Sequence, residues 1–368
     1  MNKIAEDLVF LVSCAVNGTV PDISRIQDID LDAVYTLAAR HKLTATVAFA
    51  LESAGFKDER SCNAIALSLR KSLMFDNEWN MIRSKLDDAG IWYMPLKGAV
   101  LKGMYPRCGM REFADFDILF DPARADDVRT IMEAMGYESK GFGTSNHDVY
   151  YKKPVFNFEM HRTLFGPSHD ESLFNYFKDV ENRLVRKSVY ERCFTPEDFY
   201  LYMLSHEFKH YDCSGTGLRS LLDVYVYLGK TGMDMNYVSR EAEKLGLREF
   251  EKLNRSLSRH LFSGDVLSDE ERETLDYFVS SGSYGTITHR IENTMTKKGW
   301  GKIRYALSRF FVPVSRKNRN YDAYAGMYPF FYKHKVFLPV LPFYRTFRAM
   351  KGGRFKKEAS AILNAGKQ

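Results

Sequence analysis

Two aspartates stand two positions apart, at Asp115 and Asp117, in a mostly apolar segment that spans residues 113–120. The segment is typical of a β-strand, in which successive side chains point to opposite faces. Both carboxylates therefore share one face, and Phe116 and the apolar residues at alternate positions after it pack on the other. Adjacent carboxylates repel each other unless a cation lies between them. The spacing therefore predicts a magnesium site.

A second alternating segment, residues 155–161, supplies a third carboxylate. It places Glu159 and His161 on one face and apolar side chains on the other. Three carboxylates can hold two divalent ions, which activate an attacking oxygen and stabilise a leaving pyrophosphate. We therefore expect Asp115, Asp117 and Glu159 to form the catalytic and metal site of a nucleotidyltransferase that uses Mg²⁺ or Mn²⁺. Read alone, Glu159 can also be an exposed strand residue. His161 is better explained as a residue that shapes the site or makes a buried hydrogen bond than as a metal ligand.

Three further residues before the aspartates have the chemistry that a triphosphate needs. Lys97 offers a point charge and Arg111 a planar fork for phosphate oxygens. Gly98 precedes a predicted short helix at 99–105, where it lets the backbone approach the phosphates. The alternative is that Lys97 and Gly98 form a solvated turn and that Arg111 is a surface ion-pair partner.

The order of these features resembles the uncharacterised bacterial nucleotidyltransferase family of the DNA polymerase β superfamily. Its members show a Leu-Lys-Gly turn, an Arg shortly before an Asp-x-Asp, and a strand with a carboxylate two residues before a His. A later helix bears His residues and is followed by an Arg and an Asp. The residues that match here are Leu96, Lys97, Gly98, Arg111, Asp115, Asp117, Glu159, His161, His206, His210, Arg219 and Asp223.

The resemblance implies transfer of a nucleoside monophosphate from a nucleoside triphosphate to an unidentified acceptor, which can be a small molecule, a protein or RNA. It also implies an α+β fold, with a polymerase-β-like core built on a small mixed sheet and flanked by N-terminal and C-terminal helical regions. The nucleotide-binding residues that it implies are Lys97, Gly98, Arg111, His161, His206, His210, Arg219 and Asp223.

A competing motif is His206-Glu207-x-x-His210, which matches the pattern of zinc metalloproteases. In that pattern two histidines one helical turn apart bind zinc, and the glutamate is the general base. No third ligand follows at a familiar spacing, whereas the resemblance implies that both histidines line the back of a nucleotide cleft. Arg219 and Asp223 are four positions apart on a predicted helix, which suits an intrahelical ion pair as well as contact with substrate.

The chain divides into four predicted parts. They are an N-terminal helical region, a nucleotidyltransferase core, a helical domain and a basic aromatic segment, at residues 1–90, 91–190, 191–296 and 297–368. Asp30 and Ser61 are the expected caps of N-terminal helices, and Thr195 is the expected cap of the helix that begins the third part. A short strand at 91–96 and a hairpin around Lys153-Pro154 complete the predicted sheet.

Composition favours an ordinary globular protein of 368 residues, of which 45% are hydrophobic. The five cysteines are scattered without a paired spacing, which predicts neither disulfides nor a cysteine zinc site. The apolar run at residues 8–16 follows Glu6 and Asp7, where a signal peptide would be basic. No apolar stretch is long enough to cross a bilayer. We therefore expect a cytoplasmic protein.

Charge is distributed unevenly along the chain. Residues 297–368 contain 17 Lys or Arg against two acidic residues, a net charge of +15, which leaves −9 on the rest of the chain. This segment also interleaves aromatic residues with basic ones, as nucleic-acid-binding and membrane-interface segments do. Alternatively, its aromatic side chains dock on the protein's own body. A second hypothesis for the whole chain is therefore a catalytically silent nucleotide-binding module whose basic tail holds an anionic partner.

Overall fold

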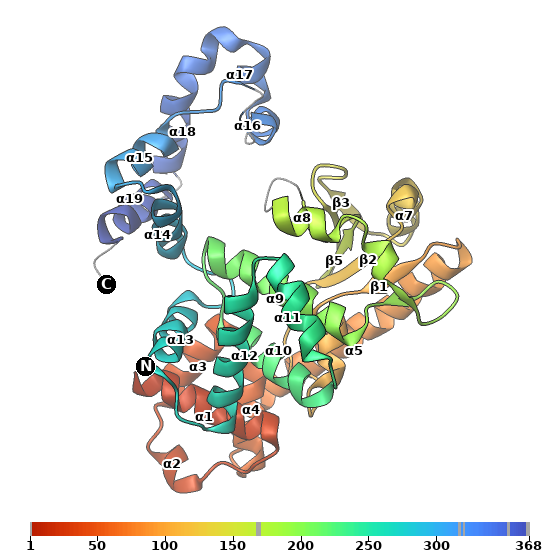
Figure 1. Cartoon of the computed structure of the whole chain (residues 1–368), viewed down its shortest axis with the longest axis vertical. Coiled ribbons are helices and arrows are strands. Elements are labelled where there is room, and N and C mark those ends of the chain that lie inside the picture. The colour runs from red at the N-terminus through yellow and green to blue at the C-terminus, as the bar shows by residue number, and fades with distance from the viewer. Residues whose placement is uncertain (1, 167–170, 316–317, 319–320, 352–353, 366–368) are drawn as a thin grey trace. The chain divides into compact units, whose positions relative to one another are not determined.

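The computed structural model describes residues 2–166, 171–315, 318, 321–351 and 354–365. The chain forms two compact units, one of Met1–Lys209 with Gly217–Ser283 and the other of His210–Thr216 with Tyr284–Gln368. The first unit combines helices with a small mixed sheet, so the predicted α+β class is confirmed (Figure 1). The domain boundaries expected at residues 90, 190 and 296 stay predictions.

Five helices precede the sheet: α1 (Lys3–Asn17), α2 (Ile23–Gln27), α3 (Leu31–His41), α4 (Thr44–Ser53) and α5 (Glu59–Asp88). Asp30 caps α3, as predicted, because its carboxylate accepts a hydrogen bond from the Ala33 amide at 3.0 Å. The prediction that Ser61 caps α5 is wrong. Asp58 caps this helix and accepts from the Ser61 amide, since an aspartate three residues earlier can satisfy the same free amides.

The main sheet has five strands in the order β1-β2-β5-β4-β3, namely β1 (Tyr93–Pro95), β2 (Phe116–Phe120), β3 (Glu138–Lys140), β4 (His147–Lys152) and β5 (Phe156–His161). β2 and β5 are parallel, and the other neighbours are antiparallel. The predicted hairpin around Lys153-Pro154 is therefore present as β4 and β5. Because β2 begins at Phe116, Asp115 lies just before the strand rather than within it, which corrects the predicted strand start.

Short helical segments connect the strands. They are α6 (Gly98–Leu101), η1 (Lys102–Met104), η2 (Pro122–Arg124) and α7 (Ala125–Ala134). One face of the sheet is aromatic: Phe116 and Phe158 pack with Phe75 and Trp79 of α5, at ring-centroid distances of 5.2–6.3 Å. Apolar residues of α7 join the same core cluster. This face gives the sheet its stability and leaves the opposite face of β2 and β5 for polar residues.

The chain then continues as α8 (Glu171–Phe177), η3 (Val180–Arg183), a small hairpin of β6 (Val185–Arg186) and β7 (Arg192–Cys193), α9 (Pro196–Cys213), α10 (Leu218–Lys230), α11 (Met235–Lys244), α12 (Arg248–Ser263) and α13 (Asp269–Ser281). Thr195 caps α9 as predicted, since its hydroxyl accepts from the Asp198 amide at 3.2 Å. Leu119 of β2 and Tyr202 of α9 belong to one core cluster. α9 therefore packs on the polar face of the sheet.

The second unit is entirely helical over its described residues, with α14 (Ile287–Lys298), α15 (Lys302–Phe310), α16 (Tyr321–Met327), α17 (Pro329–Lys333), η4 (Lys335–Val340), α18 (Leu341–Lys351) and α19 (Arg354–Asn364). Its buried apolar residues form two small clusters, around Tyr305 and around Tyr332. Among the described residues of the whole chain, every helix is too short or too polar to cross a membrane.

Candidate metal and nucleotide site

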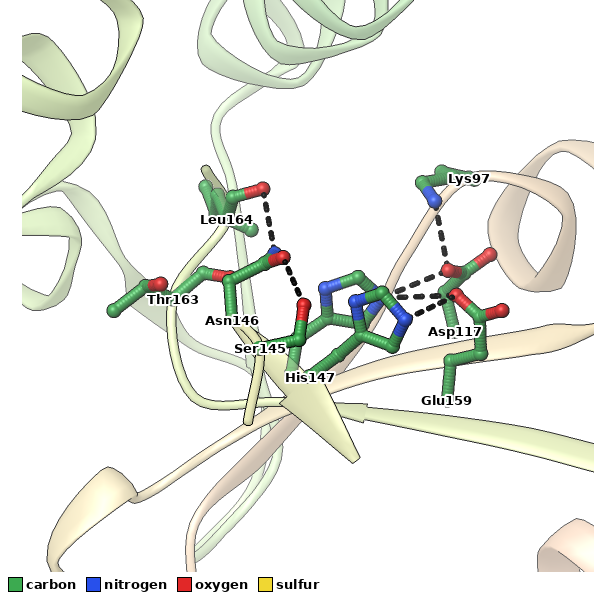
Figure 2. Close-up of polar contacts among 9 residues, drawn as sticks. Lys97, Asp117, Ser145, Asn146, His147, Glu159, Thr163 and Leu164 are labelled. Atoms are coloured by element: carbon green, nitrogen blue, oxygen red, sulfur yellow. Dashed lines mark hydrogen bonds and ion pairs between the residues drawn. The ribbon is translucent and has the colours of Figure 1, made fainter. Parts of the chain in front are cut away.

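Strand register brings two of the three predicted carboxylates together. Asp117 of β2 is paired with Glu159 of β5, and paired residues of neighbouring strands project to the same face. His161 follows Glu159 by two positions and is paired with His147 of β4, so all four side chains lie on one face. Figure 2 shows Asp117 and Glu159 side by side, with the His147 ring directed toward Glu159. Asp115 lies close enough for its charge to act on Glu159.

Lys97 forms an ion pair with the central carboxylate. Its Nζ lies 2.7 Å from Asp117 Oδ1, as Figure 2 shows. The backbone of Lys97 has a φ of 45° and a ψ of −118°, a conformation that costs a non-glycine residue of order 1–3 kcal/mol. A hydrogen bond from the Leu96 amide to the Asp117 carbonyl oxygen, at 2.9 Å, fixes this turn beside β2. The fold therefore holds a lysine in a strained position to place its ammonium on Asp117.

The three carboxylates differ in pKa because their surroundings differ. Burial raises the pKa of Asp117, but Lys97 and His161 outweigh burial and hold it well below its usual range. Burial and the neighbouring Asp117 charge raise the pKa of Asp115. Burial, together with the charges of Asp117 and Asp115, raises the pKa of Glu159 to about 7. Lys97 alone therefore does not compensate the negative charge of this cluster.

The pKa values of the two histidines beside Glu159 are both lowered. Burial is the main cause that lowers the pKa of His147, to about 4, and it also lowers the pKa of His161. His161 is only 4% exposed, and its Nε2 lies 2.8 Å from Asp117 Oδ1. His161 therefore makes a buried hydrogen bond to Asp117, and its expected nucleotide-binding role stays a prediction.

Arg111 and Asp223 form a buried ion pair behind the Lys97 turn. Arg111 Nε lies 2.7 Å from Asp223 Oδ1 and Arg111 Nη2 lies 2.8 Å from Oδ2. The Tyr105 hydroxyl donates to the same carboxylate at 2.7 Å. A Cβ at position 98 would collide with the Arg111 guanidinium. Gly98 is thus required for the approach of this arginine. The nucleotide-binding roles expected of Gly98, Arg111 and Asp223 stay predictions, and the contacts described here are within the protein.

Arg219, in the first turn of α10, makes a different contact from the one its spacing suggests. It donates to the Glu112 carbonyl oxygen at 3.2 Å, whereas Asp223 is bonded to Arg111. The intrahelical pair with Asp223, one of the two alternatives that the spacing left open, is absent among the described residues, because Asp223 is the partner of the buried Arg111 instead. The pKa of Asp115 is raised by burial and by Asp117, and the positive charge of Arg219 opposes this rise. Arg219 therefore lies near the carboxylate cluster.

The His-Glu-x-x-His motif lies on α9. His206 follows Tyr202 by one turn, with their ring centroids 6.4 Å apart, while His210 is exposed in the last turn and belongs to the second unit. Glu207 is buried and accepts a hydrogen bond from Asn254 of α12 at 2.8 Å. A glutamate held this way is not positioned as the general base of a zinc site. Within the described part of the chain, the motif's histidines belong to no group of three potential metal ligands.

Three residues near the site were not anticipated from the sequence: His147, Tyr202 and Lys209. Burial is the largest cause that raises the pKa of Tyr202. The charges of Asp117 and Glu159 raise it further, and the charge of Lys97 opposes them. The charge of Lys209 lowers the pKa of both His147 and His161. Residues 202, 206 and 209 recur at i, i+4 and i+7, the spacing of one helix face, and this pattern was available in the sequence. His147 had no such signal, because its role depends on strand pairing.

The donor set fits a divalent cation. The three carboxylates carry more negative charge than the one neighbouring lysine can balance, and hard divalent ions prefer carboxylate oxygens. The Tyr202 hydroxyl is buried beside these groups and has no hydrogen-bond partner within the described ranges. A buried hydroxyl normally makes a hydrogen bond, so the Tyr202 hydroxyl is available to bond a ligand in the site. Asp115, Asp117 and Glu159 are the residues that would hold the ion.

Comparison with known proteins identifies a family. Residues 27–263 match the family model described as uncharacterised nucleotidyltransferase. No curated protein and no solved structure matches the chain. The matched range contains every residue of the site described above. The chain therefore belongs to this family of uncharacterised nucleotidyltransferases.

Proposed function

We propose that this protein transfers a nucleoside monophosphate from a nucleoside triphosphate to an acceptor, with Mg²⁺ or Mn²⁺ as cofactor. The observation that carries the proposal is the pairing of Asp117 with Glu159 across parallel strands, because it places on one face two of the carboxylates that this reaction needs. Membership of a nucleotidyltransferase family supports the reaction class.

In the proposed reaction an acceptor oxygen attacks the α-phosphorus of the triphosphate. A bond forms between these two atoms, and the bond from the α-phosphorus to the oxygen that bridges to the β-phosphorus breaks. Pyrophosphate leaves with the electron pair of that bond, and the acceptor loses its proton. Bound divalent ions would neutralise phosphate charge and make the acceptor hydroxyl easier to deprotonate.

The residues of the chain have separate roles in this proposal. Asp115, Asp117 and Glu159 hold the cations, and Lys97 keeps Asp117 ionised through their ion pair. Arg219 is the guanidinium best suited to bind a phosphate, since within the described residues it has no carboxylate within ion-pair distance. Arg111 is less suited, because Asp223 already occupies its fork.

The test uses nucleoside triphosphates labelled at the α-phosphorus, with Mg²⁺ and a panel of acceptors that includes the protein itself, transfer RNA, sugars and antibiotics. We expect label to move to an acceptor with the wild-type protein and not with Asp115→Ala or Asp117→Asn. Asp121→Asn is the matched control. Asp121 follows β2 directly and caps η2, and asparagine caps a helix equally well.

Two results would contradict the proposal. One is label transfer that persists in Asp117→Asn. The other is Mg²⁺-dependent triphosphate binding in calorimetry with no transfer to any acceptor in the panel, which would favour the silent nucleotide-binding module. Stoichiometric zinc in the purified protein that is lost in His206→Ala would instead favour the metalloprotease interpretation.

A further inference from the structure

Glu159 has two histidine neighbours that a site made only for magnesium does not need. His147 Nε2 lies 3.6 Å and His161 Nε2 lies 3.7 Å from Glu159 Oε2. The two rings lie 4.9 Å apart between centroids. Each of the three residues offers one ligand atom, and these atoms lie within 4.8 Å of one another.

These separations suit three ligands of one ion. Bonds of about 2.0–2.2 Å from a metal to nitrogen and oxygen place neighbouring ligand atoms roughly 3.3 Å apart in a tetrahedral site. The separations of the two nitrogens from the Glu159 oxygen therefore exceed this value by a few tenths of an ångström. Asp117 Oδ1 lies on the same face, 2.8 Å from His161 Nε2, and accepts from Lys97 Nζ at 2.7 Å.

The histidine side chains are positioned but incompletely bonded. Asn146 Nδ2 donates to the carbonyl oxygens of Thr163 and Leu164, at 3.1 and 3.4 Å, and so ties the start of β4 to the end of β5 (Figure 2). The Nδ1 atoms of His147 and His161 are buried and lack a hydrogen-bond partner in the part of the chain that the structure describes. The ring atoms that face Glu159 are the two Nε2 nitrogens, and that of His161 also lies 2.8 Å from Asp117 Oδ1.

We propose that His147, Glu159 and His161 form a binding site for a transition-metal ion such as Co²⁺ or Zn²⁺. Imidazole nitrogens suit these ions, whereas Mg²⁺ prefers oxygen ligands in an octahedron. The inference rests on the proposed function in one respect, because Glu159 holds a metal ion in both. The inference adds His147 and His161 as nitrogen ligands, and it predicts that the site prefers a transition-metal ion to Mg²⁺.

The test measures metal binding rather than catalysis. The metal-free protein is titrated with Co²⁺ alone, followed by calorimetry and by the visible absorption of bound Co²⁺, and then with Mg²⁺ alone. We expect one Co²⁺ bound far more tightly than Mg²⁺, and an affinity at least about 100-fold lower in His147→Ala. His147→Gln is a second variant in case the alanine protein does not fold. His260→Ala is the control, since His260 is bonded to Glu271 on α13 and should not change binding.

Equal Co²⁺ affinity in both His147 variants and the wild type would overturn the inference, as would Co²⁺ binding no tighter than that of Mg²⁺. These results are distinguishable from failure of the proposed function. Tight Co²⁺ binding that depends on His147, without any nucleotide transfer, would refute only the proposed function. Transfer supported by Mg²⁺, without a His147-dependent Co²⁺ site, would refute only this inference.

A separate observation concerns α18 in the second unit. Phe343, Phe347 and Met350 recur at i, i+4 and i+7 and are 58–66% exposed, so they form one apolar stripe. Arg348 and Lys351 lie beside it, one position after Phe347 and Met350, and Lys351 Nζ lies 4.9 Å from the centroid of the Phe347 ring. An apolar stripe flanked by cations is the pattern of helices that lie in a membrane interface.

We infer that this face of α18 binds the surface of an anionic lipid bilayer. Charge complementarity supports the choice, because residues 297–368 carry a net charge of +15 and anionic lipids attract such segments. Exposed apolar groups of neighbouring η4 support it further, since Val336 and Val340 are 78% and 52% exposed. Aliphatic groups of this kind gain from contact with lipid chains and offer no stacking surface to a nucleic acid base.

Flotation with vesicles tests this inference on the full chain. We expect binding to vesicles of phosphatidylcholine with phosphatidylserine and little binding to phosphatidylcholine alone. Phe347→Glu should weaken binding at least about tenfold, while Val266→Glu, which changes an 85% exposed valine of the first unit, should not. Unchanged binding by Phe347→Glu, absence of binding to anionic vesicles, or preferential binding to RNA in competition would overturn it.

Discussion

Removal of the Asp223 carboxylate is the most informative perturbation of the fold around the site. The side chains of Arg111 and Asp223 are only 6% and 9% exposed, and two hydrogen bonds of 2.7 and 2.8 Å join them. Asp223→Ala leaves the Arg111 charge buried without its partner, which costs about 3–5 kcal/mol. It also deprives the Tyr105 hydroxyl of its acceptor. We expect the free energy of unfolding to fall by about this amount.

Urea unfolding measured by tryptophan fluorescence provides the assay. The chain has three tryptophans, and a Trp300→Phe background leaves Trp79 and Trp92, which both belong to the first unit. The control is Glu52→Ala. It removes an exposed ion pair, in which the side chains of Arg107 and Glu52 are 49% and 35% exposed, and such pairs contribute less than about 1 kcal/mol.

A double variant separates a structural role from a general intolerance of position 223. Arg111→Met with Asp223→Leu replaces both charges with apolar side chains, which is often neutral for buried pairs. We expect it to recover most of the stability lost in Asp223→Ala. A loss below about 1 kcal/mol in Asp223→Ala would refute the reasoning, because Arg111 would then not depend on this carboxylate.

Three further outcomes follow from the contacts around the site. Gly98→Ala should lower the melting temperature through a collision that costs about 1–3 kcal/mol, whereas Gly103→Ala, with open space around the added carbon, should not. Burial raises the pKa of Glu207 to about 8, so the folded state binds more protons than the unfolded state between about pH 4.5 and 8. The free energy of unfolding therefore falls as pH rises through this range. Urea unfolding at several pH values should show that it falls less steeply with pH in Glu207→Gln, which keeps an acceptor for Asn254. Asn146→Ala should lower Co²⁺ affinity about 10- to 100-fold in calorimetry, because support of a ligand is lost.

The elements that depend on local pattern were predictable from the sequence. Alternation identified β2 and β5, and with them the shared face of Asp117 and Glu159. The hairpin at Lys153-Pro154 and the cap at Thr195 were likewise evident from residue type. Ser61 was misassigned as a cap because Asp58, three residues earlier, has the same chemistry. Local signals thus defined elements well and their ends less well.

Contacts between distant segments were not predictable in the same way. Arg111 and Asp223 are 112 positions apart, so no periodicity links them, and the spacing of Asp223 from Arg219 suggested a different partner. His147 acquires its place only because β4 pairs with β5. The strained backbone of Lys97 likewise has no signature in residue type, since glycine would be the expected residue for a positive φ.

The parallel pairing of β2 with β5 has a consequence for how this site can arise. A displacement of β5 by one residue along β2 would present Phe158 or Met160 to Asp117 in place of Glu159, because side chains alternate. The same displacement would withdraw both neighbouring imidazoles. Chemistry that needs Glu159 at this face therefore depends on this one register of β5 against β2. A single-residue insertion in β5 before Glu159 should abolish the site even where the protein still folds.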